Sequence, residues 1–184
     1  MNAFINGEAD AYAKRNAGHS SVEPWFVGMV LAADPRSIVD LGCGDAERLL
    51  HLRSHCIDCL GVDARSGANI HRPGLHLIYG QDVETYEIPA CDMVSFNYVL
   101  HWLEKADEVI ERAMKASKHL LIHDFFPAVP IDVAYAHAPG IVTRKRQYGT
   151  RCKAAGWELH SVMRYHYHNN PAAEWCSAEI WRKP

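Results

Sequence analysis

The sequence predicts an α/β domain built on a mostly parallel, seven-stranded sheet, and three observations support this fold class. Short apolar runs alternate with helical patterns from residue 37 to residue 124, which is typical of parallel strands joined by helices that cover both faces of a sheet. The first of these units, Ser37 to Glu47, joins a β-branched run to two glycines and an acidic helix start. The last two strand patterns follow each other directly, so they predict an antiparallel hairpin at one edge of the sheet.

The N-terminal part of the chain is predicted to be helical. Residues 8–16 form a polar helical pattern. Ser20 or Ser21 then caps a second helix, and Pro24 lies in its first turn, where a missing N–H has little consequence. Asp34 and the proline after it end this helix. Its apolar residues recur on one face, namely Val22, Trp25, Phe26, Met29 and Val30.

The middle of the chain predicts three strands separated by two helices. Ile38 and Val39 suit a strand that is buried on both faces, and Pro73 stops the second of the following helical patterns. The expected strands are 37–41, 57–62 and 75–79, and the expected helices are 45–55 and 64–71.

The rest of the chain predicts one long helix and the other four strands. Apolar residues recur at helical spacing between residues 99 and 118, whereas three prolines mark residues 125–140 as an irregular loop. A short helix over 147–155 ends at Gly156. The expected strands are 93–96, 120–124, 158–167 and 174–181, the last two joined by a turn at 169–171.

Length and composition exclude several classes of protein. A chain of 184 residues suits one domain, and a net charge of −3 argues against a nucleic-acid partner. The N-terminus lacks the features of a signal peptide, and no apolar run approaches the roughly 20 residues that span a bilayer. Six cysteines do not make a dense disulfide framework, so a reduced, cytoplasmic protein without a membrane segment is expected.

The glycine turn predicts a nucleotide-like ligand that carries no phosphate. Gly42 and Gly44 let a ligand approach the backbone, but Glu47 stands where a dinucleotide site has its third glycine. Asp45 and Glu47 would repel a pyrophosphate at the helix N-terminus, whereas they tolerate a ligand with ammonium and sulfonium groups. Asp63 lies 21 residues after Gly42 (63 − 42), the offset at which an acid meets a ribose diol. A helix N-cap is the alternative role for Asp63.

Four motifs in order resemble those of class I S-adenosylmethionine-dependent methyltransferases. The resemblance covers residues 36–182, and Ala46 departs from it mildly because many members have a third glycine there. The chain also looks similar to small sugar- and secondary-metabolite-associated members. The motifs are Asp40-Leu-Gly-Cys-Gly44, Asp63, Gln81-Asp82 and Asn97-Tyr-Val-Leu-His-Trp102.

The resemblance implies a Rossmann-like three-layer sandwich that binds S-adenosylmethionine and releases S-adenosylhomocysteine. Residues 1–34 would cover the cofactor site, and residues 35–184 would form the binding domain. Asp82 would accept a hydrogen bond from the adenine amino group, although capping of a following turn is the alternative. Tyr12 and Arg15 would face the methionyl carboxylate, and a solvated helix is the alternative for this pair. The full set of implied cofactor residues is Tyr12, Arg15, Asp40, Gly42, Cys43, Gly44, Asp63, Ala64, Gln81, Asp82, Val83, Asn97 and Tyr98.

Candidates for chemistry on the acceptor follow the fourth and fifth strands. Methyl transfer is an in-line displacement, so the protein mainly aligns the acceptor with the methyl group and excludes water. An alcohol or ammonium acceptor must also lose a proton, which His101 could take. Tyr98 lies on the same acceptor side, and His123 with Asp124 forms a second pair at a strand end. Alternatively, His101 only makes a hydrogen bond to the backbone, and His123 and Asp124 only end their strand.

The expected function is methyl transfer to a hydroxyl or amine of a small molecule. A non-catalytic cofactor- or partner-binding protein of the same fold is the alternative function. A homodimer is one option for the assembly of this protein. Three further patterns are weaker: a metal site at Cys56-x-x-Cys59 or His166-x-His168, and an anion site at Lys145, Arg146 and Tyr148. No metal is expected, because neither pair of ligands has an obvious third or fourth member.

Overall fold

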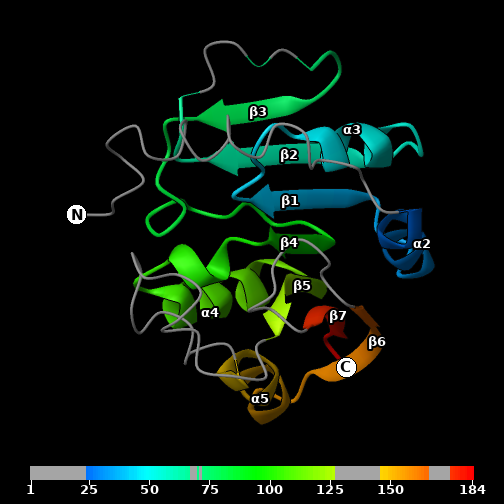
Figure 1. Cartoon of the computed structure of the whole chain (residues 1–184), viewed down its shortest axis with the longest axis vertical. Helices are drawn as coiled ribbons and strands as arrows, with labels where there is room; N and C mark the ends of the chain where they lie inside the picture. Colours follow the sequence, from blue (N-terminus) through cyan, green and yellow to red (C-terminus); the bar gives the residue numbers. More distant parts are fainter. Residues whose placement is uncertain (1–23, 67–69, 71, 127–145, 166–174) are drawn as a thin grey trace.

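Apolar strands separated by amphipathic helices form a seven-stranded α/β fold (Figure 1). The computed structural model describes residues 24–66, 70, 72–126, 146–165 and 175–184. The strands are β1 (Ser37–Leu41), β2 (Asp58–Asp63), β3 (His76–Tyr79), β4 (Met93–Asn97), β5 (His119–Phe126), β6 (Glu158–Tyr165) and β7 (Trp175–Arg182). The helices are α2 (Pro24–Ala32), α3 (Glu47–Arg53), η2 (Leu100–Trp102, a 3-10 turn), α4 (Ala106–Ala116) and α5 (Arg146–Ala154).

The strand order is β3-β2-β1-β4-β5-β7-β6. Strands β1 to β5 pair in parallel, whereas β7 runs antiparallel to both β5 and β6. The expectation of a mostly parallel sheet with an antiparallel C-terminal hairpin is therefore confirmed. The turn expected at residues 169–171 lies outside the described residues, as does the helix expected at residues 8–16.

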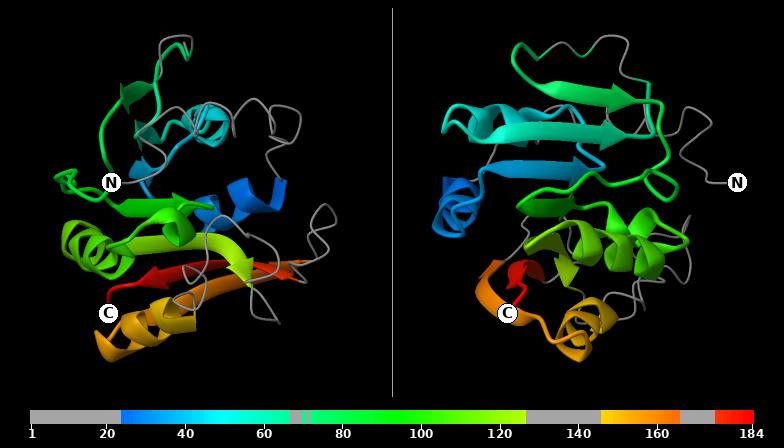
Figure 2. Two further views of the ribbon diagram at one scale, coloured as in Figure 1. Left: turned by 60° about the vertical axis from the view of Figure 1, so that its left-hand side comes forward. Right: turned by 180° about the vertical axis from the view of Figure 1, so that it is seen from behind.

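Helices cover both faces of the sheet, as the two views of Figure 2 show. Phe26 and Val30 of α2 pack on one face together with Leu49 and Leu52 of α3. The other face carries α4 and α5, whose apolar residues form a second core cluster with β4 and β5. Phe26 and Val30 are fully buried, so the apolar face predicted for this helix is confirmed at these two positions.

Two predicted helices differ from the structure. The long helix expected over residues 99–118 is broken into η2 and α4. The break occurs because the backbone N–H groups of Glu104 and Lys105 donate to the Glu84 carboxylate instead of continuing a helix. The described residues of the helix expected over 64–71, which are 64–66 and 70, are not helical. There the Arg65 N–H donates to Asp63, and the Arg65 carbonyl accepts from Gly80.

The position of β1 determines where a ligand can bind. Strand β1 lies between β2 and β4, so the connections leaving its two neighbours run in opposite directions along the sheet. Such a switch point opens a crevice beyond the carboxyl ends of the strands. Within the described residues, no helix is long and apolar enough to cross a membrane.

Candidate functional site

The glycine turn after β1 requires glycine at two positions. Gly42 has φ +79°, and a Cβ there would lie 2.4 Å from a methyl carbon of Val99. Gly44 has φ +64°, and its Cβ would lie 2.8 Å from Nη2 of Arg65. Both positions therefore combine a left-handed backbone with close neighbours, which only glycine accommodates without strain.

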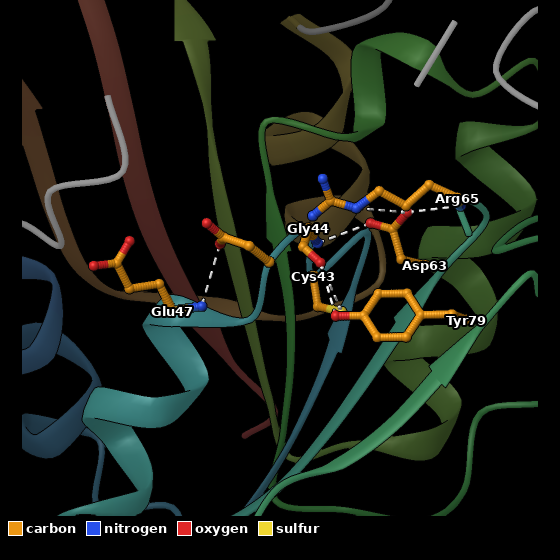
Figure 3. A network of polar contacts seen from close by, with 7 residues as sticks. Cys43, Gly44, Glu47, Asp63, Arg65 and Tyr79 are labelled. Atoms are coloured by element: carbon orange, nitrogen blue, oxygen red, sulfur yellow. Dashed lines mark hydrogen bonds and ion pairs between the residues drawn. The ribbon is translucent and has the colours of Figure 1, made fainter. Parts of the chain in front are cut away.

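Asp63, at the end of β2, is tied to this turn (Figure 3). Its Oδ2 accepts a 2.8 Å hydrogen bond from the Gly44 N–H, and its Oδ1 accepts a 2.9 Å bond from the Arg65 N–H. The Arg65 guanidinium lies 3.6 Å from the same Oδ1, and both side chains are mostly buried. Asp63 thus caps a local turn, not the helix that its alternative role required, and it also joins β2 to the glycine turn.

Two residues of this network were missed by the sequence analysis. Tyr79 donates from its hydroxyl to the Gly44 carbonyl at 3.0 Å, and Arg65 packs over Gly44 (Figure 3). Burial raises the pKa of Tyr79, so its hydroxyl stays protonated and can donate at neutral pH. Their positions in the sequence could have indicated them, because residues at the carboxyl ends of strands lie near the predicted site. Tyr79 ends β3, and Arg65 follows the end of β2 by two residues.

Ala46 stands where many proteins of the family that the sequence resembles have a third glycine, and its backbone conformation is strained. It has φ 58° and ψ 23°, a left-handed conformation, and it precedes α3 as the N-cap residue. It is completely buried in the α2 and α3 core cluster. A left-handed alanine costs roughly 1–2 kcal/mol, which the buried methyl group partly offsets. The substitution is therefore accommodated by packing rather than by backbone freedom.

The acids at the start of α3 remain near the turn, as the sequence predicts. Asp45 accepts a hydrogen bond from the Glu47 N–H at 3.3 Å through Oδ1, so it satisfies one of the unpaired donors at this helix end. Two carboxylates at the helix start leave no favourable place for a pyrophosphate. The region accordingly suits a ligand without phosphate groups.

Asp82 follows β3 and caps a turn. Its Oδ1 accepts from the Glu84 N–H at 2.9 Å, which agrees with the alternative role given to it. Gln81 is fixed by a hydrogen bond from its N–H to the Asp63 carbonyl, and Val83 is buried in the core. The role of Asp82 toward adenine, with Ala64, Gln81 and Val83 beside it, stays a prediction.

A buried polar cluster lies beneath the ends of β1, β4 and β5. Asp40 is 2% exposed, and its Oδ1 accepts from Ser95 Oγ at 2.6 Å and from Asn97 Nδ2 at 2.8 Å. Burial raises the pKa of the Asp40 carboxyl, and the hydrogen bonds from Ser95 and Asn97 act against that rise. The other end of the Asn97 amide, Oδ1, lies 3.3 Å from His123 Nδ1.

The ring of His123 is enclosed by aromatic side chains. His123 is 0% exposed, and its ring centroid lies 5.4 Å from that of Trp25, 5.9 Å from Phe26 and 4.4 Å from Tyr98. Arg48 lies above Phe26 and Tyr98, 5.6 Å and 5.8 Å from their centroids, within the range of cation–π attraction.

Tyr98 and Asp124 complete the described part of the predicted acceptor side. Tyr98 has φ 54°, and its N–H donates to the His123 carbonyl at 2.8 Å. Asp124 is 4% exposed and lies in register with Ser177 of β7. The structure thus brings Tyr98 and His123 together. Asp124 is a buried carboxyl on the neighbouring position of β5.

Several predicted residues are placed elsewhere or lie outside the described residues. Tyr12, Arg15, Lys145 and the pair His166 and His168 lie outside them, as do the side chains of His101 and Arg146. Tyr148 is buried, and its hydroxyl donates to the Leu100 carbonyl at 3.5 Å. This packing does not suit the anion contact considered for Tyr148.

The described residues contain no cluster of three or more potential metal ligands. Cys56 is exposed and Cys59 is buried, so the two cysteines of the Cys-x-x-Cys pattern face different surroundings.

The turn and its neighbours fit an S-adenosylmethionine-like ligand chemically. Gly42 and Gly44 give the turn a left-handed backbone that other residues rarely adopt, and Asp63 offers the strong acceptor that a ribose diol requires. The net character of the turn is acidic, which suits a ligand with ammonium and sulfonium charges. The Arg65 guanidinium lies against Gly44, and Arg72 Nε donates to the Asp45 carbonyl, so positive charge is also present beside these acids.

Comparisons with known proteins agree with this fit. A family model described as "Methyltransferase domain" matches residues 26–166. No curated protein sequence matches the chain. Many solved structures share its fold, including the N-methyltransferase NodS from Bradyrhizobium japonicum in complex with S-adenosylhomocysteine. NodS has a TM-score of 0.65 and 15% identity, over 96% of this chain and 98% of NodS.

Two other neighbours mark the chemical range of the fold. Magnesium protoporphyrin IX methyltransferase from Synechocystis, also with bound S-adenosylhomocysteine, has a TM-score of 0.71 and 12% identity. The match covers 100% of this chain and 97% of that protein. The [4+2]-cyclase SpnF has a TM-score of 0.65 and 15% identity, over 87% of this chain and 80% of SpnF.

Proposed function

Because this chain belongs to the methyltransferase domain family, of the class I type that uses S-adenosylmethionine, we propose that it transfers a methyl group to a hydroxyl or amine of a small molecule. The methyl donor is the cofactor of the family, and the acceptor class is the new part of the proposal. Within the described residues between 37 and 126, β1 to β5 follow one another without an inserted domain, which supports a small acceptor.

The observation that carries the proposal is the set of polar groups at the carboxyl ends of β1, β2 and β4. The Gly44 N–H and the Asp63 carboxylate meet at 2.8 Å, and Asp40 and Asn97 meet at 2.8 Å on the other side of β1. These two pairs flank the crevice where open α/β sheets bind ligands. One pair suits a ribose diol, and the other end of the crevice suits the methionyl group.

Each residue has a defined role under this proposal. S-adenosylmethionine supplies an electrophilic methyl group on a sulfonium. Asp63 would accept hydrogen bonds from the ribose hydroxyls, and Gly42 and Gly44 would allow the methionyl chain to lie against the backbone. The Asn97 carbonyl would face the ammonium group, because its side-chain amide is already engaged by Asp40 and His123. Asp82 would accept from adenine through the oxygen that does not cap its turn.

The acceptor must be aligned and must lose a proton. Tyr98 follows Asn97 and is held in a left-handed conformation, so its ring is fixed at the end of β4. His101 lies in η2, directly after this point, and is the residue we propose as proton acceptor. The role of the protein beyond this is to hold acceptor and donor in line and to exclude water.

Isothermal titration with S-adenosylhomocysteine tests the cofactor site. We expect the wild-type chain to bind, and Asp63→Asn to weaken binding about tenfold or more, because charged acceptors make the stronger hydrogen bonds. Asp58→Asn is the matched control, since Asp58 begins the same strand and is exposed. Absence of binding by a folded wild-type chain at millimolar ligand would rule out the proposal.

Transfer of a radiolabelled methyl group to small alcohols, phenols and amines tests the acceptor class. Labelled product that disappears with His101→Ala, at unchanged affinity for S-adenosylhomocysteine, would support the proposed proton acceptor. The fold neighbour SpnF is a cyclase, so a second candidate is a cofactor-binding protein that transfers no methyl group. Normal cofactor binding without transfer to any acceptor class would favour this second candidate.

A further inference from the structure

We propose that His123 is a positioning residue, which donates from Nδ1 to Asn97 and thereby fixes the end of β4 against the cofactor crevice. This inference rests on the proposed function, because Asn97 and Tyr98 are the residues that the crevice would present to cofactor and acceptor. It assigns His123 a role different from that of the acceptor-side base considered from the sequence.

The direction of the hydrogen bonds follows from chemistry. The Asp40 Oδ1 already accepts from Ser95, and it can only accept from Asn97, so the nitrogen of the Asn97 amide faces Asp40. The amide oxygen of Asn97 therefore faces His123, where it lies 3.3 Å from Nδ1. An amide oxygen only accepts, so Nδ1 of His123 carries the proton.

Packing places His123 beneath the site and away from solvent. Its side chain is completely buried, with Trp25 and Phe26 of α2 against its ring. A ring enclosed in this way is a rigid support. It holds Asn97 and Tyr98 at the end of β4, since it lies in register with Asn97 and packs against the Tyr98 ring at a centroid distance of 4.4 Å and an interplanar angle of 51°.

Tyr98 needs this support because its backbone is strained. A tyrosine at φ 54° persists only where its surroundings determine the conformation. His123 supplies two such contacts, since its carbonyl accepts from the Tyr98 N–H at 2.8 Å and its ring packs on the Tyr98 ring. His123 thus sets the position of both consecutive residues at the mouth of the crevice.

Binding of S-adenosylhomocysteine by a set of variants tests this role. His123→Phe keeps an aromatic ring in the pocket but removes the donor, and we expect about tenfold weaker binding. His123→Asn places an amide donor near the position of Nδ1, and we expect it to recover part of the lost affinity. The double variant His123→Phe, Asn97→Ala should bind no more weakly than Asn97→Ala alone, because His123 acts through Asn97.

His119→Phe is the matched control, since His119 begins the same strand at the end away from Asn97 and should leave binding unchanged. Wild-type affinity in His123→Phe, or additive losses in the double variant, would overturn the proposal. A base that only takes a proton from the acceptor would leave the affinity for S-adenosylhomocysteine unchanged, so this readout separates the two roles.

Nitrogen-15 NMR of the histidine rings tests the proposal without any ligand. We expect a protonated Nδ1 for His123, assigned as the resonance lost in His123→Asn, and an unprotonated Nδ1 would overturn the proposal. Where His123→Asn fails to fold, the resonance lost in His123→Phe gives the same assignment. If the wild-type chain shows the protonated Nδ1 but binds no S-adenosylhomocysteine, the proposed function fails, and with it the positioning role.

Discussion

Gly42 shows how a single residue position can be set by two constraints at once. It combines a left-handed backbone with contact against Val99, at the start of the segment that leads into η2. The sequence predicted that this glycine and Gly44 allow a ligand to approach. It could not show that Val99 occupies the space beside Gly42, because that contact joins residues far apart in the chain.

Gly42→Ala is expected to destabilise the protein by about 2–4 kcal/mol, since left-handed strain adds to a steric clash. Gly156→Ala is the matched control, because Gly156 has φ +80° with nothing within 4 Å of a Cβ, and it should cost about 1 kcal/mol. Urea denaturation of both variants measures the difference. Equal losses would show that Val99 moves aside without cost.

Other residue roles were predicted in type but not in detail. Asp63 was expected near the glycine turn from its spacing, and it does contact Gly44. Asn97 was expected at the crevice, but its side chain turns inward to Asp40 and His123. The inward direction depends on which buried groups need partners, and a strand pattern carries no such information.

At the scale of elements, the strands were predicted better than the connections. Strands have buried apolar runs that are visible in the sequence, and all seven were expected close to their observed positions. The two incorrect helices failed because backbone groups that a helix would pair bond to other segments. Glu84 accepts from the N–H groups of residues 104 and 105, and the Arg65 carbonyl accepts from the Gly80 N–H.

Asp92 joins three strand starts and gives a prediction at this scale. Its Oδ2 accepts from the Arg36 N–H before β1, and its Oδ1 accepts from Lys118 before β5. Its own N–H donates to Ser37 Oγ at 2.9 Å. We expect Asp92→Ala to lower the free energy of unfolding by about 1–2 kcal/mol at neutral pH. Lys118→Ala removes only the exposed ion pair and should cost less than about 1 kcal/mol.

The pH dependence of this loss has a defined sign. The hydrogen bond from Lys118 lowers the pKa of Asp92 below its ordinary 3.8. A carboxyl whose pKa is lowered by folding stabilises the protein above 3.8, and this contribution is lost as the pH falls through the folded-state value. Urea midpoints of wild type and Asp92→Ala should therefore converge on acidification. A difference between the two urea midpoints that stays constant as the Asp92 carboxyl becomes protonated would contradict a role for its negative charge.

At the scale of the whole molecule, the two cores protect most of the cysteines. Cys43, Cys59 and Cys152 are buried, Cys91 is half-buried and Cys56 is exposed. Burial raises the pKa of Cys59 and Cys152 to about 12 and that of Cys91 to about 11. Their thiols therefore stay protonated and unreactive in the folded protein.

Thiol labelling of the native protein should then modify Cys56 first, and the other four cysteines only after unfolding. The experiment uses a Cys176→Ser background, because the side chain of Cys176 lies outside the described residues. S-adenosylhomocysteine at 100 times its Kd adds about 2.7 kcal/mol, so it should slow labelling of the protected thiols about 100-fold. Rapid labelling of Cys59 in the native state would show that this core opens locally.

The overall architecture was predictable because its signals are repeated along the chain. Alternating strands and helices indicate a parallel sheet, and the terminal hairpin adds antiparallel strands at one edge. The insertion of β7 between β5 and β6 was not predicted, because a hairpin pattern does not indicate which of its two strands pairs with the rest of the sheet. The contact between Tyr98 and His123 was among the least predictable features, because it joins residues of different segments that only the folded sheet brings together.

The hydrogen bonds of Asp40 have a consequence for the order in which the protein folds. Gly44 and Asp63 are 19 residues apart, so the half of the crevice proposed for ribose closes a short loop. Asp40 finds Ser95 and Asn97 only 55 and 57 residues later. Because longer loops cost more entropy to close, the floor beneath the methionyl end should form late in folding. A chain emerging from the ribosome would then be unable to hold its methyl donor until β4 has joined β1.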